Sequence, residues 1–233
     1  MPLTIGLFGT GRLGSAIRRV ADGREDVEVR WAVGSRDRLD LSPVDVALDV
    51  STGSAVAEHV DWAARTGTDL VIGATGWDPA TVERDLGIRV LVAPNFSLGV
   101  ALARRVSRLL GEYAAASRAE GIPVDLAVTE THHRHKVDAP SGTAVVLREA
   151  LARGAGTGTE DVQTTSLRLG EVVGDHEVTL ATATETITLR HTAHDRDLFA
   201  AGALTAATWL TTRPAPGLFT LDDLAEDHLK ETA

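Results

Sequence analysis

The residues most able to do chemistry stand in one short window, residues 130–144, which reads Glu-Thr-His-His-Arg-His-Lys-Val-Asp-Ala-Pro-Ser-Gly-Thr-Ala. Histidine, arginine and lysine fill positions 132–136 without a break. When such groups are protonated they repel one another, which lowers their proton affinity and makes a purely structural role costly. The window therefore predicts a site that binds an anionic ligand and transfers protons.

The end of the same window favours a carboxylate as that anion. Ser141, Gly142 and Thr143 open a predicted helix, whose first N–H groups and positive dipole end attract a carboxylate. Lys136 lies among other cations, so we expect it to lose its proton more readily than a free lysine. A small-molecule dicarboxylate would satisfy the cluster.

A glycine-rich loop near the start of the chain predicts a dinucleotide site. It follows an apolar run at residues 3–8 and precedes a helical pattern, and its glycines have the spacing Gly-x-Gly-x-x-Gly. Such a turn lets the backbone approach a pyrophosphate at a helix N-terminus. We expect the cofactor to contact Gly9, Thr10, Gly11, Arg12, Leu13 and Gly14. A plain strand-to-helix connection is the alternative interpretation.

The end of the second predicted strand bears on the choice of cofactor. An acidic residue there would accept the ribose hydroxyls of NAD, but this chain has Gly34-Ser35-Arg36. Ser35 and Arg36 suit the additional phosphate of NADP, so we expect NADPH to be preferred, with NADH also possible. A solvated loop arginine is the alternative.

Two further loops follow the fourth and fifth predicted strands. Their small residues allow close approach, and their polar groups suit a nicotinamide carboxamide. The expected cofactor contacts are Gly73, Ala74, Thr75, Ala93, Pro94, Asn95 and Phe96. Both loops could equally be ordinary turns.

The elements that must position these residues alternate over the first part of the chain. Strand patterns alternate with helical patterns at residues 55–65 and 79–85, and the strands fall at residues 3–8, 27–33, 44–50, 70–74 and 89–93. This order predicts an α/β fold that begins with a Rossmann-like, doubly wound parallel sheet. Ligands gather at the carboxyl ends of the strands in such sheets.

The second part has the pattern of an α+β domain on an open mixed or antiparallel sheet. Helices are predicted at residues 100–113, 141–152 and 199–210, and strands at residues 125–131, 164–168, 177–182 and 185–191. We therefore expect residues 1–97 plus 201–233 to form the dinucleotide-binding domain. Residues 98–200 would form the substrate-binding and oligomerisation domain, with hinges near residues 97–99 and 200–202.

Composition limits the classes of function. The chain has 233 residues with 33 acidic and 23 basic ones, and its net charge of -10 argues against nucleic acid or an anionic membrane as partner. No apolar run is long enough to span a bilayer, and we expect a cytoplasmic protein. The absence of cysteine excludes disulfides, thiolate metal sites and a cysteine nucleophile.

The run from His132 to Ala144 resembles the signature of the 4-hydroxy-tetrahydrodipicolinate reductase (dihydrodipicolinate reductase) family. Residues 73–77, 93–100 and 170–176 are similar to other family segments, so the resemblance covers nearly the whole chain. It implies an NAD(P)H-dependent oxidoreductase acting on CH or CH2 groups in diaminopimelate and lysine biosynthesis. Hydride would go to one carbon of a cyclic, unsaturated dicarboxylate and a proton to its neighbour.

The same resemblance implies roles for individual residues. His132 would be the general acid/base and Lys136 the proton donor, while His133, Gly142 and Thr143 would bind substrate together with Ser141. It also implies a homotetramer. The segment at residues 152–164 is shorter than in many relatives, which puts assembly and closure in question.

Other interpretations of the histidine cluster stay open. If residues 130–136 continue as a strand, Glu130 and His132 face one way while His133 and His135 face the other. Either pair could begin a metal site, but a third ligand is not visible and we expect no metal. The remaining alternatives are an NADP-dependent reductase of a related cyclic imine acid and a non-catalytic NADP(H)-sensing protein.

Overall fold

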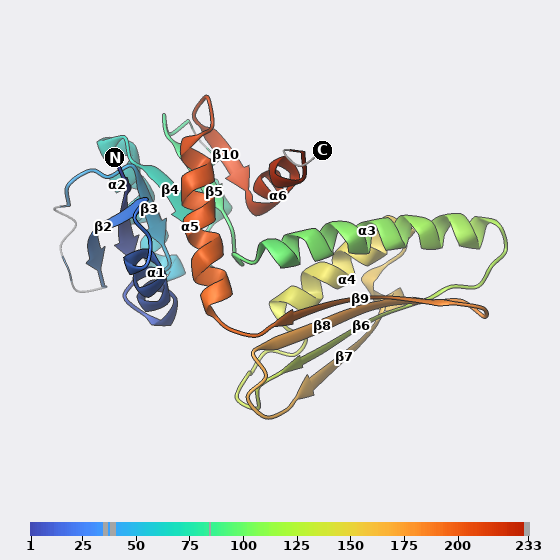
Figure 1. Cartoon of the computed structure of the whole chain (residues 1–233). Helices are drawn as coiled ribbons and strands as arrows, with labels where there is room; N and C mark the ends of the chain where they lie inside the picture. Colours follow the sequence, from blue (N-terminus) through green and yellow to red (C-terminus); the bar gives the residue numbers. More distant parts are fainter. Residues whose placement is uncertain (35–36, 38–40, 84, 231–233) are drawn as a thin grey trace. The chain divides into compact units, whose positions relative to one another are not determined.

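The computed structural model describes residues 1–34, 37, 41–83 and 85–230, and the chain divides into two compact units (Figure 1). The first holds Met1–Ser97 with Arg196–Ala233, and the second holds Leu98–Asp195. The sequence-based boundary after residue 200 falls inside a helix, α5 (Asp197–Thr211), that belongs to the first unit. Each unit has its own sheet.

The sheet of the first unit is parallel throughout and has the strand order β10-β5-β4-β3-β1-β2. Its strands are β1 (Leu3–Phe8), β2 (Val27–Val33), β3 (Val46–Asp49), β4 (Asp69–Ile72), β5 (Arg89–Val92) and β10 (Gly217–Thr220). Because β2 and β3 flank β1 on opposite sides, the succession of strands reverses at β1. That reversal places the loops after β1 and β3 side by side at the carboxyl edge, the usual place for a ligand.

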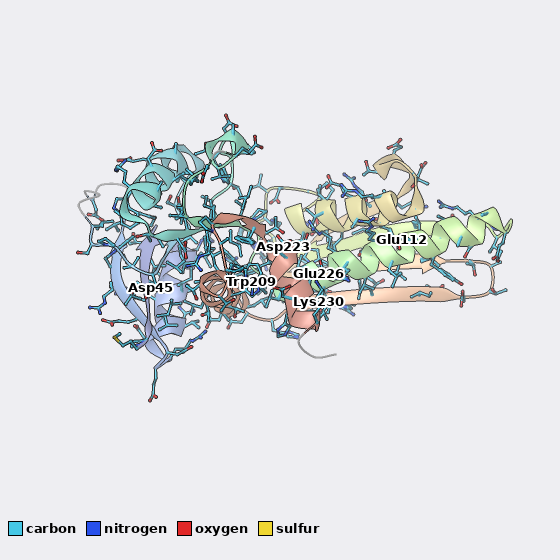
Figure 2. All side chains as sticks on the ribbon, turned by 90° about the horizontal axis from the view of Figure 1, so that it is seen from above. Asp45, Glu112, Trp209, Asp223, Glu226 and Lys230 are labelled. Atoms are coloured by element: carbon cyan, nitrogen blue, oxygen red, sulfur yellow. The ribbon has the colours of Figure 1, made fainter. Side chains whose placement is uncertain are left out.

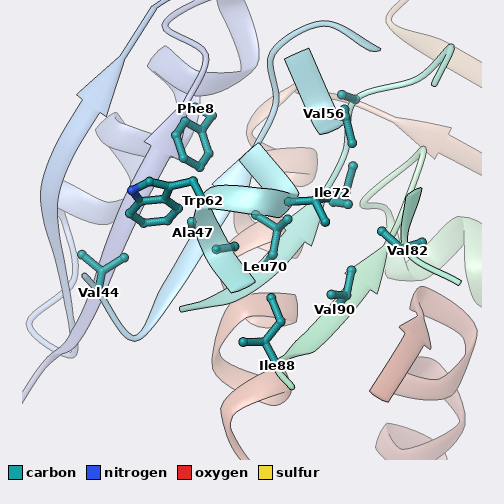
Figure 3. Close-up of a cluster of buried hydrophobic side chains, with 13 residues drawn as sticks. Phe8, Val44, Ala47, Val56, Trp62, Leu70, Ile72, Val82, Ile88 and Val90 are labelled. Carbon is teal, nitrogen blue, oxygen red and sulfur yellow. The ribbon is translucent and has the colours of Figure 1, made fainter. Parts of the chain in front are cut away.

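Helices cover both faces of this sheet, as expected for a doubly wound fold. α1 (Arg12–Asp22) packs against α5, whereas α2 (Val56–Thr66) follows a short 3-10 turn, η1 (Gly53–Ala55), and packs on the other face. Figure 3 shows Trp62 of α2 close to Phe8 and Ala47, and their apolar contacts extend to Leu70 and Ile72 of β4. The expected Rossmann-like sheet is confirmed.

The prediction of a helix at residues 79–85 is wrong, because the described residues of that segment form only a 3-10 turn, η2 (Pro79–Thr81). The carboxylate of Asp78 accepts the Ala80 N–H at 3.0 Å, and that of Asp85 accepts the Gly87 N–H at 3.0 Å. Side chains that bond to nearby backbone in this way favour turns over helix.

The C-terminal strand β10 and helix α6 (Leu221–Lys230) were not predicted. β10 joins the sheet edge by backbone pairing with β5 and buries little, so it carries no apolar pattern. α6 did have a signal, since the Thr220 N–H donates to Asp223 at 2.7 Å in a Thr-x-x-Asp cap. Figure 2 shows Glu226 and Lys230 further along α6, where their charged atoms lie 3.1 Å apart.

The second unit is built on a four-stranded sheet with the order β7-β6-β8-β9. β6 (Asp125–His132) runs parallel to β7 (Gln163–Arg168) and antiparallel to β8 (Gly174–Ala181), which pairs with β9 (Thr186–Ala193). The sheet is therefore mixed, and the expected fold class is confirmed. α3 (Leu98–Ala119) and α4 (Gly142–Ala155) pack together over it, and η3 (Thr159–Asp161) follows α4.

Alternation along β6 decides which of its side chains enter the core. Leu126, Val128, Glu130 and His132 are buried, whereas the residues between them are more exposed. Two polar side chains thus share the core-facing side of β6 with two apolar ones.

Among the described residues, no helix is long and apolar enough to cross a membrane.

Candidate functional site

The glycine loop lies at the carboxyl end of β1. Gly9 has a φ of +108°, and a Cβ there would lie 2.7 Å from the carbonyl oxygen of Val50. A Cβ on Gly14 would overlap the carbonyl oxygen of Gly9. Both positions need glycine because α1 starts directly against the ends of β1 and β3.

The first turn of α1 fits the phosphates of a dinucleotide. Gly11 is its N-cap, and no described heavy atom lies within 4 Å of where a Gly11 Cβ would be. Thr10, Gly11 and Arg12 are exposed, and Leu13 is half-buried. Open space in front of helix-terminal N–H groups is what a pyrophosphate requires.

The chain after β2 approaches this loop. Ser35 and Arg36, the predicted contacts to a 2′-phosphate, lie outside the described residues. Asp37 is exposed and accepts the Gly34 N–H at 2.7 Å, and a Cβ on Gly34 would lie 3.2 Å from Oγ1 of Thr10. The sequence interpretation missed this carboxylate, which suits ribose hydroxyls better than a phosphate.

The loop after β4 is fixed to the end of β3. The N–H groups of Gly73 and Ala74 donate to the carbonyl of Asp49 at 2.8 and 3.1 Å, and the indole N–H of Trp77 donates to the carbonyl of Ala74 at 2.8 Å. Ala74 is buried, whereas Thr75 is exposed. Thr75 is therefore the polar side chain of this loop that a cofactor can reach.

The loop after β5 offers polar groups at two positions. Phe96 is buried, and a Cβ on Gly73 would overlap its ring, so Phe96 packs inside the first unit. Asn95 is half-buried and accepts the Ser97 N–H at 2.8 Å. Ala93 is buried and Pro94 is exposed. What this loop offers a nicotinamide is mainly Asn95 and backbone groups.

A buried carboxylate–histidine pair, which the sequence interpretation did not foresee, lies beside these loops. Oδ2 of Asp49 is 2.7 Å from Nδ1 of His59, while Oδ1 accepts the N–H and hydroxyl of Ser51 at 3.0 and 2.5 Å. The His59 ring stacks on Phe8 with 3.9 Å between centroids. The pair ties the ends of β1 and β3 to α2.

A second buried pair lies at the end of β6 in the second unit. Glu130 and His132 stand two residues apart on one face of the strand, and Nδ1 of His132 bonds to Oε2 of Glu130. Oε1 of Glu130 also accepts the backbone N–H of Ser141 at 3.3 Å. The Glu130 carboxylate thus holds His132, the predicted acid/base, and connects it to the start of α4.

Arg168, the last residue of β7, connects this pair to the lysine loop. It stands opposite His132 in the β6–β7 register, and its Nη2 donates to Oε1 of Glu130 at 2.9 Å. Its Nε donates to the carbonyl of Lys136 at 3.2 Å, and Nη2 also bonds to the carbonyl of Asp138. One guanidinium therefore holds both the strand and the loop.

The charge states follow from burial and these bonds. Burial disfavours the charged form of Glu130, yet side-chain hydrogen bonds outweigh it and hold the pKa of Glu130 below its ordinary value; they come from Arg168, Ser166 and His132. Burial lowers the pKa of His132 despite the opposing effect of Glu130, and it lowers the pKa of His176 to about 4. Both histidines are therefore neutral near pH 7.

The three predicted substrate contacts at the start of α4 differ in burial. Ser141 is buried, and its Oγ accepts the Ala144 N–H at 3.2 Å and lies 3.2 Å from Nε2 of His176. Gly142 is exposed, with no described heavy atom within 4 Å of a would-be Cβ, and Thr143 is half-buried. Ser141 caps the helix. The backbone of Gly142 bonds to the Asp138 carboxylate, so a ligand carboxylate at this exposed helix start would take the place of Asp138.

The predicted cation cluster has internal partners. Nζ of Lys136 lies 2.8 Å from Asp138, and Nε of Arg134 lies 3.7 Å from Glu171. The hydrogen bond from Lys136 lowers the pKa of Asp138. The protein's own carboxylates thus balance part of the expected repulsion, so an anionic ligand is not the only available partner.

The structure adds a third possible metal ligand to one of the two predicted pairs, but the other predicted pair does not lie on a strand. β6 ends at His132, so His133 and His135 leave the strand, with 6.4 Å between their ring centroids. Glu130, His132 and His176 have ligand atoms within 4.8 Å of one another. Hydrogen bonds already engage the Glu130 carboxylate and Nδ1 of His132, and they compete with a metal ion.

Comparison with known proteins decides the family. The family model described as "Dihydrodipicolinate reductase, N-terminus" matches residues 3–96, and "Dihydrodipicolinate reductase, C-terminus" matches residues 99–225. The chain belongs to the dihydrodipicolinate reductase family. As a member of this family it is an oxidoreductase that uses a nicotinamide cofactor and acts on a small molecule, as the sequence resemblance implied.

Curated relatives in the dihydrodipicolinate reductase family match almost end to end. A 4-hydroxy-tetrahydrodipicolinate reductase of Gluconobacter oxydans is 38% identical over 94% of this chain and 95% of its own length. One from Methanopyrus kandleri is 34% identical over 94% of each chain. The solved structure titled "Dipicolinate bound Dihydrodipicolinate reductase from Paenisporosarcina sp. TG-14" has a TM-score of 0.75 at 21% identity and covers 96% of this chain and 100% of that one. That likeness shows a shared fold.

Proposed function

We propose that this chain reduces 4-hydroxy-tetrahydrodipicolinate in diaminopimelate and lysine biosynthesis. The observation that carries the proposal is the buried Glu130–His132 pair, bonded to the start of α4 and linked through Arg168 to the loop of Lys136. Relatives that bear this enzyme name support it. The Paenisporosarcina structure is described as bound to dipicolinate, a ring with two carboxylates.

The residues of the second unit have complementary roles in this proposal. The loops after β1, β4 and β5 would hold a nicotinamide cofactor, which would supply the hydride for one ring carbon. Lys136 gives the proton to the neighbouring carbon, and His132 acts as general acid/base. Backbone groups of Gly142 and Thr143 at the start of α4 hold a ring carboxylate. That carboxylate can replace Asp138 as the partner of the Lys136 ammonium.

The direct test is an assay with the substrate generated freshly by the preceding enzyme of the route. Loss of absorbance of the reduced nicotinamide should depend on the chain and on the substrate. Related cyclic imine acids, tested at the same concentration, should react much more slowly. A folded chain that gives no rate above background would contradict the proposal, and faster turnover of another imine acid would replace the substrate.

Lys136→Ala tests the assignment of the proton donor. We expect kcat to fall by about 100-fold or more, the usual contribution of proton transfer, with cofactor affinity unchanged. Lys230→Ala is the matched control, because Lys230 also forms an ion pair, with Glu226 on α6, in the first unit. Retained turnover in Lys136→Ala would remove lysine from the mechanism.

We also propose a preference for NADPH over NADH, carried by Ser35 and Arg36. Asp37 opposes it, because its exposed carboxylate repels a 2′-phosphate. Asp37→Ser should therefore raise the ratio of kcat/KM for NADPH to that for NADH by several-fold. A ratio far below one in the unaltered chain would refute the preference.

Oligomeric state and location stay predictions. We propose a homotetramer through the face of the mixed sheet opposite α3 and α4, where Leu167 is exposed beside Thr131. Light scattering after size-exclusion chromatography measures the subunit number directly. The proposed location is the cytoplasm, where the substrate of such a pathway would be made.

A further inference from the structure

We infer that Glu130 is a positioning residue that fixes the tautomer of His132, keeping its proton on Nδ1 and leaving Nε2 to exchange protons with the substrate. This inference rests on the proposed function, because it gives His132 the acid/base role. It adds a buried residue that acts on the reaction through the imidazole ring.

The hydrogen bonds around Glu130 settle which nitrogen carries the proton. Arg168 and the backbone of Ser141 both donate to Oε1, and side-chain hydrogen bonds, first of all from Arg168, hold the pKa of Glu130 below its ordinary value. The carboxylate is therefore ionised near pH 7 and acts only as an acceptor. The ring nitrogen that faces Oε2 is Nδ1 of His132, and it must therefore be the donor. In a neutral imidazole the other nitrogen, Nε2, is then an unprotonated acceptor.

The surroundings of Nε2 leave room for such an exchange. A Cβ on Gly174 would lie 3.1 Å from Nε2, so the missing side chain keeps that side of the ring uncrowded. The ring of His176 stands edge-on to His132 with 5.0 Å between centroids. Because burial lowers the pKa of His176 to about 4, this neighbour is neutral near pH 7 and adds no repulsion.

The same carboxylate balances the charge that the exchange creates. A proton taken up at Nε2 turns the ring into an imidazolium, and the ring becomes neutral again when Nε2 releases that proton. Burial and the nearby charges of Lys136 and Arg168 disfavour the imidazolium, whereas Glu130 favours it. Loss of the Glu130 charge would leave the cationic form without its main support.

Glu130→Gln is the decisive variant, because the amide has the same shape without the charge. Its NH2 group can donate to Nδ1 and drive the proton to Nε2. We expect kcat to fall by about 100- to 10,000-fold, as when a catalytic histidine is held in the wrong tautomer, with cofactor affinity unchanged. The 15N spectrum of histidine-labelled protein should show His132 change from Nδ1–H to Nε2–H, with its signal assigned by loss in His132→Gln.

Asp69→Asn is the matched control. Asp69 is also a buried carboxylate, and it accepts two bonds from Arg89 in the first unit at 2.7 and 2.9 Å. The Asp69→Asn variant should lose stability as Glu130→Gln does. Its kcat, the pH profile of kcat and the 15N signals of His132 should be unchanged. A common loss of stability is thereby separated from an effect on the ring.

Gly174→Ala tests the Nε2 side independently. The methyl group would press on Nε2, so we expect kcat to fall while the Nδ1–H signal of His132 persists. The inference is overturned if unaltered protein carries the His132 proton on Nε2, if Glu130→Gln keeps its kcat, or if Gly174→Ala does. Absence of reductase activity in unaltered protein would instead contradict the proposed function. The 15N spectrum would still show which nitrogen of His132 carries the proton.

Discussion

The two units each contain a buried carboxylate bonded to Nδ1 of a histidine, yet only one pair has the surroundings of a reactive site. Side-chain exposure is 9% for His59 and 0% for Asp49, and it is also 9% for His132 and 0% for Glu130. Burial and pairing therefore do not distinguish the two. The difference must come from what surrounds each ring.

The Asp49–His59 pair is closed off by packing. The His59 ring stacks on Phe8, which in turn meets Trp62 at 5.3 Å between centroids, and the carboxylate is completed by Ser51. These neighbours are apolar or neutral. Such a pair anchors the ends of two strands to a helix and keeps the loops that follow them in place.

The Glu130–His132 pair instead has charged and open neighbours. Arg168 bonds to the carboxylate and to the loop that carries Lys136, and the exposed start of α4 at Gly142 is one residue beyond the Ser141 N–H that bonds to Glu130. The comparison teaches that a histidine–carboxylate pair is no functional signal by itself. Cations and an exposed helix start beside it provide the signal.

The largest expected effects come from replacing each of the two paired histidines by leucine. One variant should lose activity with little loss of stability, and the other should lose stability with little loss of activity. His132→Leu should lower kcat by about 1,000-fold, because an acid/base group is lost, with a modest loss of stability since Arg168 still binds Glu130. His59→Leu should cost about 3 kcal/mol of unfolding free energy, because the fully buried Asp49 loses its histidine. Steady-state kinetics and urea denaturation measure the two effects.

The outcomes of this pair of variants are easy to tell apart. If His59→Leu abolishes turnover at saturating cofactor while it remains folded, the first pair is more than an anchor. If His132→Leu turns over normally, the contrast between the pairs fails. A change of less than about tenfold in kcat for His59→Leu agrees with an indirect effect on the cofactor loops.

A pH titration should give an effect on stability that is confined to the second unit. Burial lowers the pKa of His176 from 6.5 to about 4, so between these values the unfolded chain binds more protons than the folded one. Stability should therefore rise with pH across that window, by about 3 kcal/mol from this group, and the contribution is flat above pH 6.5. His132 and His191, whose pKa values burial also lowers, act in the same direction.

Two probes separate the units in this titration. All four tryptophans belong to the first unit, so their fluorescence follows it, while amide hydrogen exchange in β8 follows the second. His176→Gln should flatten the rise in β8 protection and leave the tryptophan signal unchanged. If protection of β8 in His176→Gln still rises with pH as steeply as in the unaltered protein, other groups cause the pH dependence.

The sequence predicted most of the fold wherever burial imposed a pattern. β1 has the predicted bounds because a parallel strand covered on both faces is a short apolar run between polar turns. β2 has the predicted bounds although it lies at the sheet edge, because apolar residues alternate with Glu28 and Arg30 along it. β10 was missed because an exposed edge strand is held by backbone pairing, which leaves no such run. The helix expected at residues 79–85 failed because Asp78 and Asp85 bond to nearby N–H groups.

The candidate site was predictable only as far as neighbours along the chain define it. Spacing placed Glu130 and His132 on one face of a strand, and the structure joins them. Arg168 and His176 face them across β7 and β8, in register with His132 and Glu130 respectively. No spacing in one sequence reveals which strands pair, so these two partners could not be found before the sheet was known.

The smallest test compares the two serines that complete the pairs. Ser51→Ala and Ser141→Ala should each cost about 1 kcal/mol, the first by removing a bond to Asp49 and the second by removing the cap of α4. Ser141→Ala should also raise KM for the dicarboxylate several-fold, because a frayed first turn holds an anion less well, whereas Ser51→Ala should leave that KM unchanged. Equal KM values in both variants would show that the start of α4 does not hold the substrate, and the contrast between the two pairs would then rest on Arg168 and Lys136 alone.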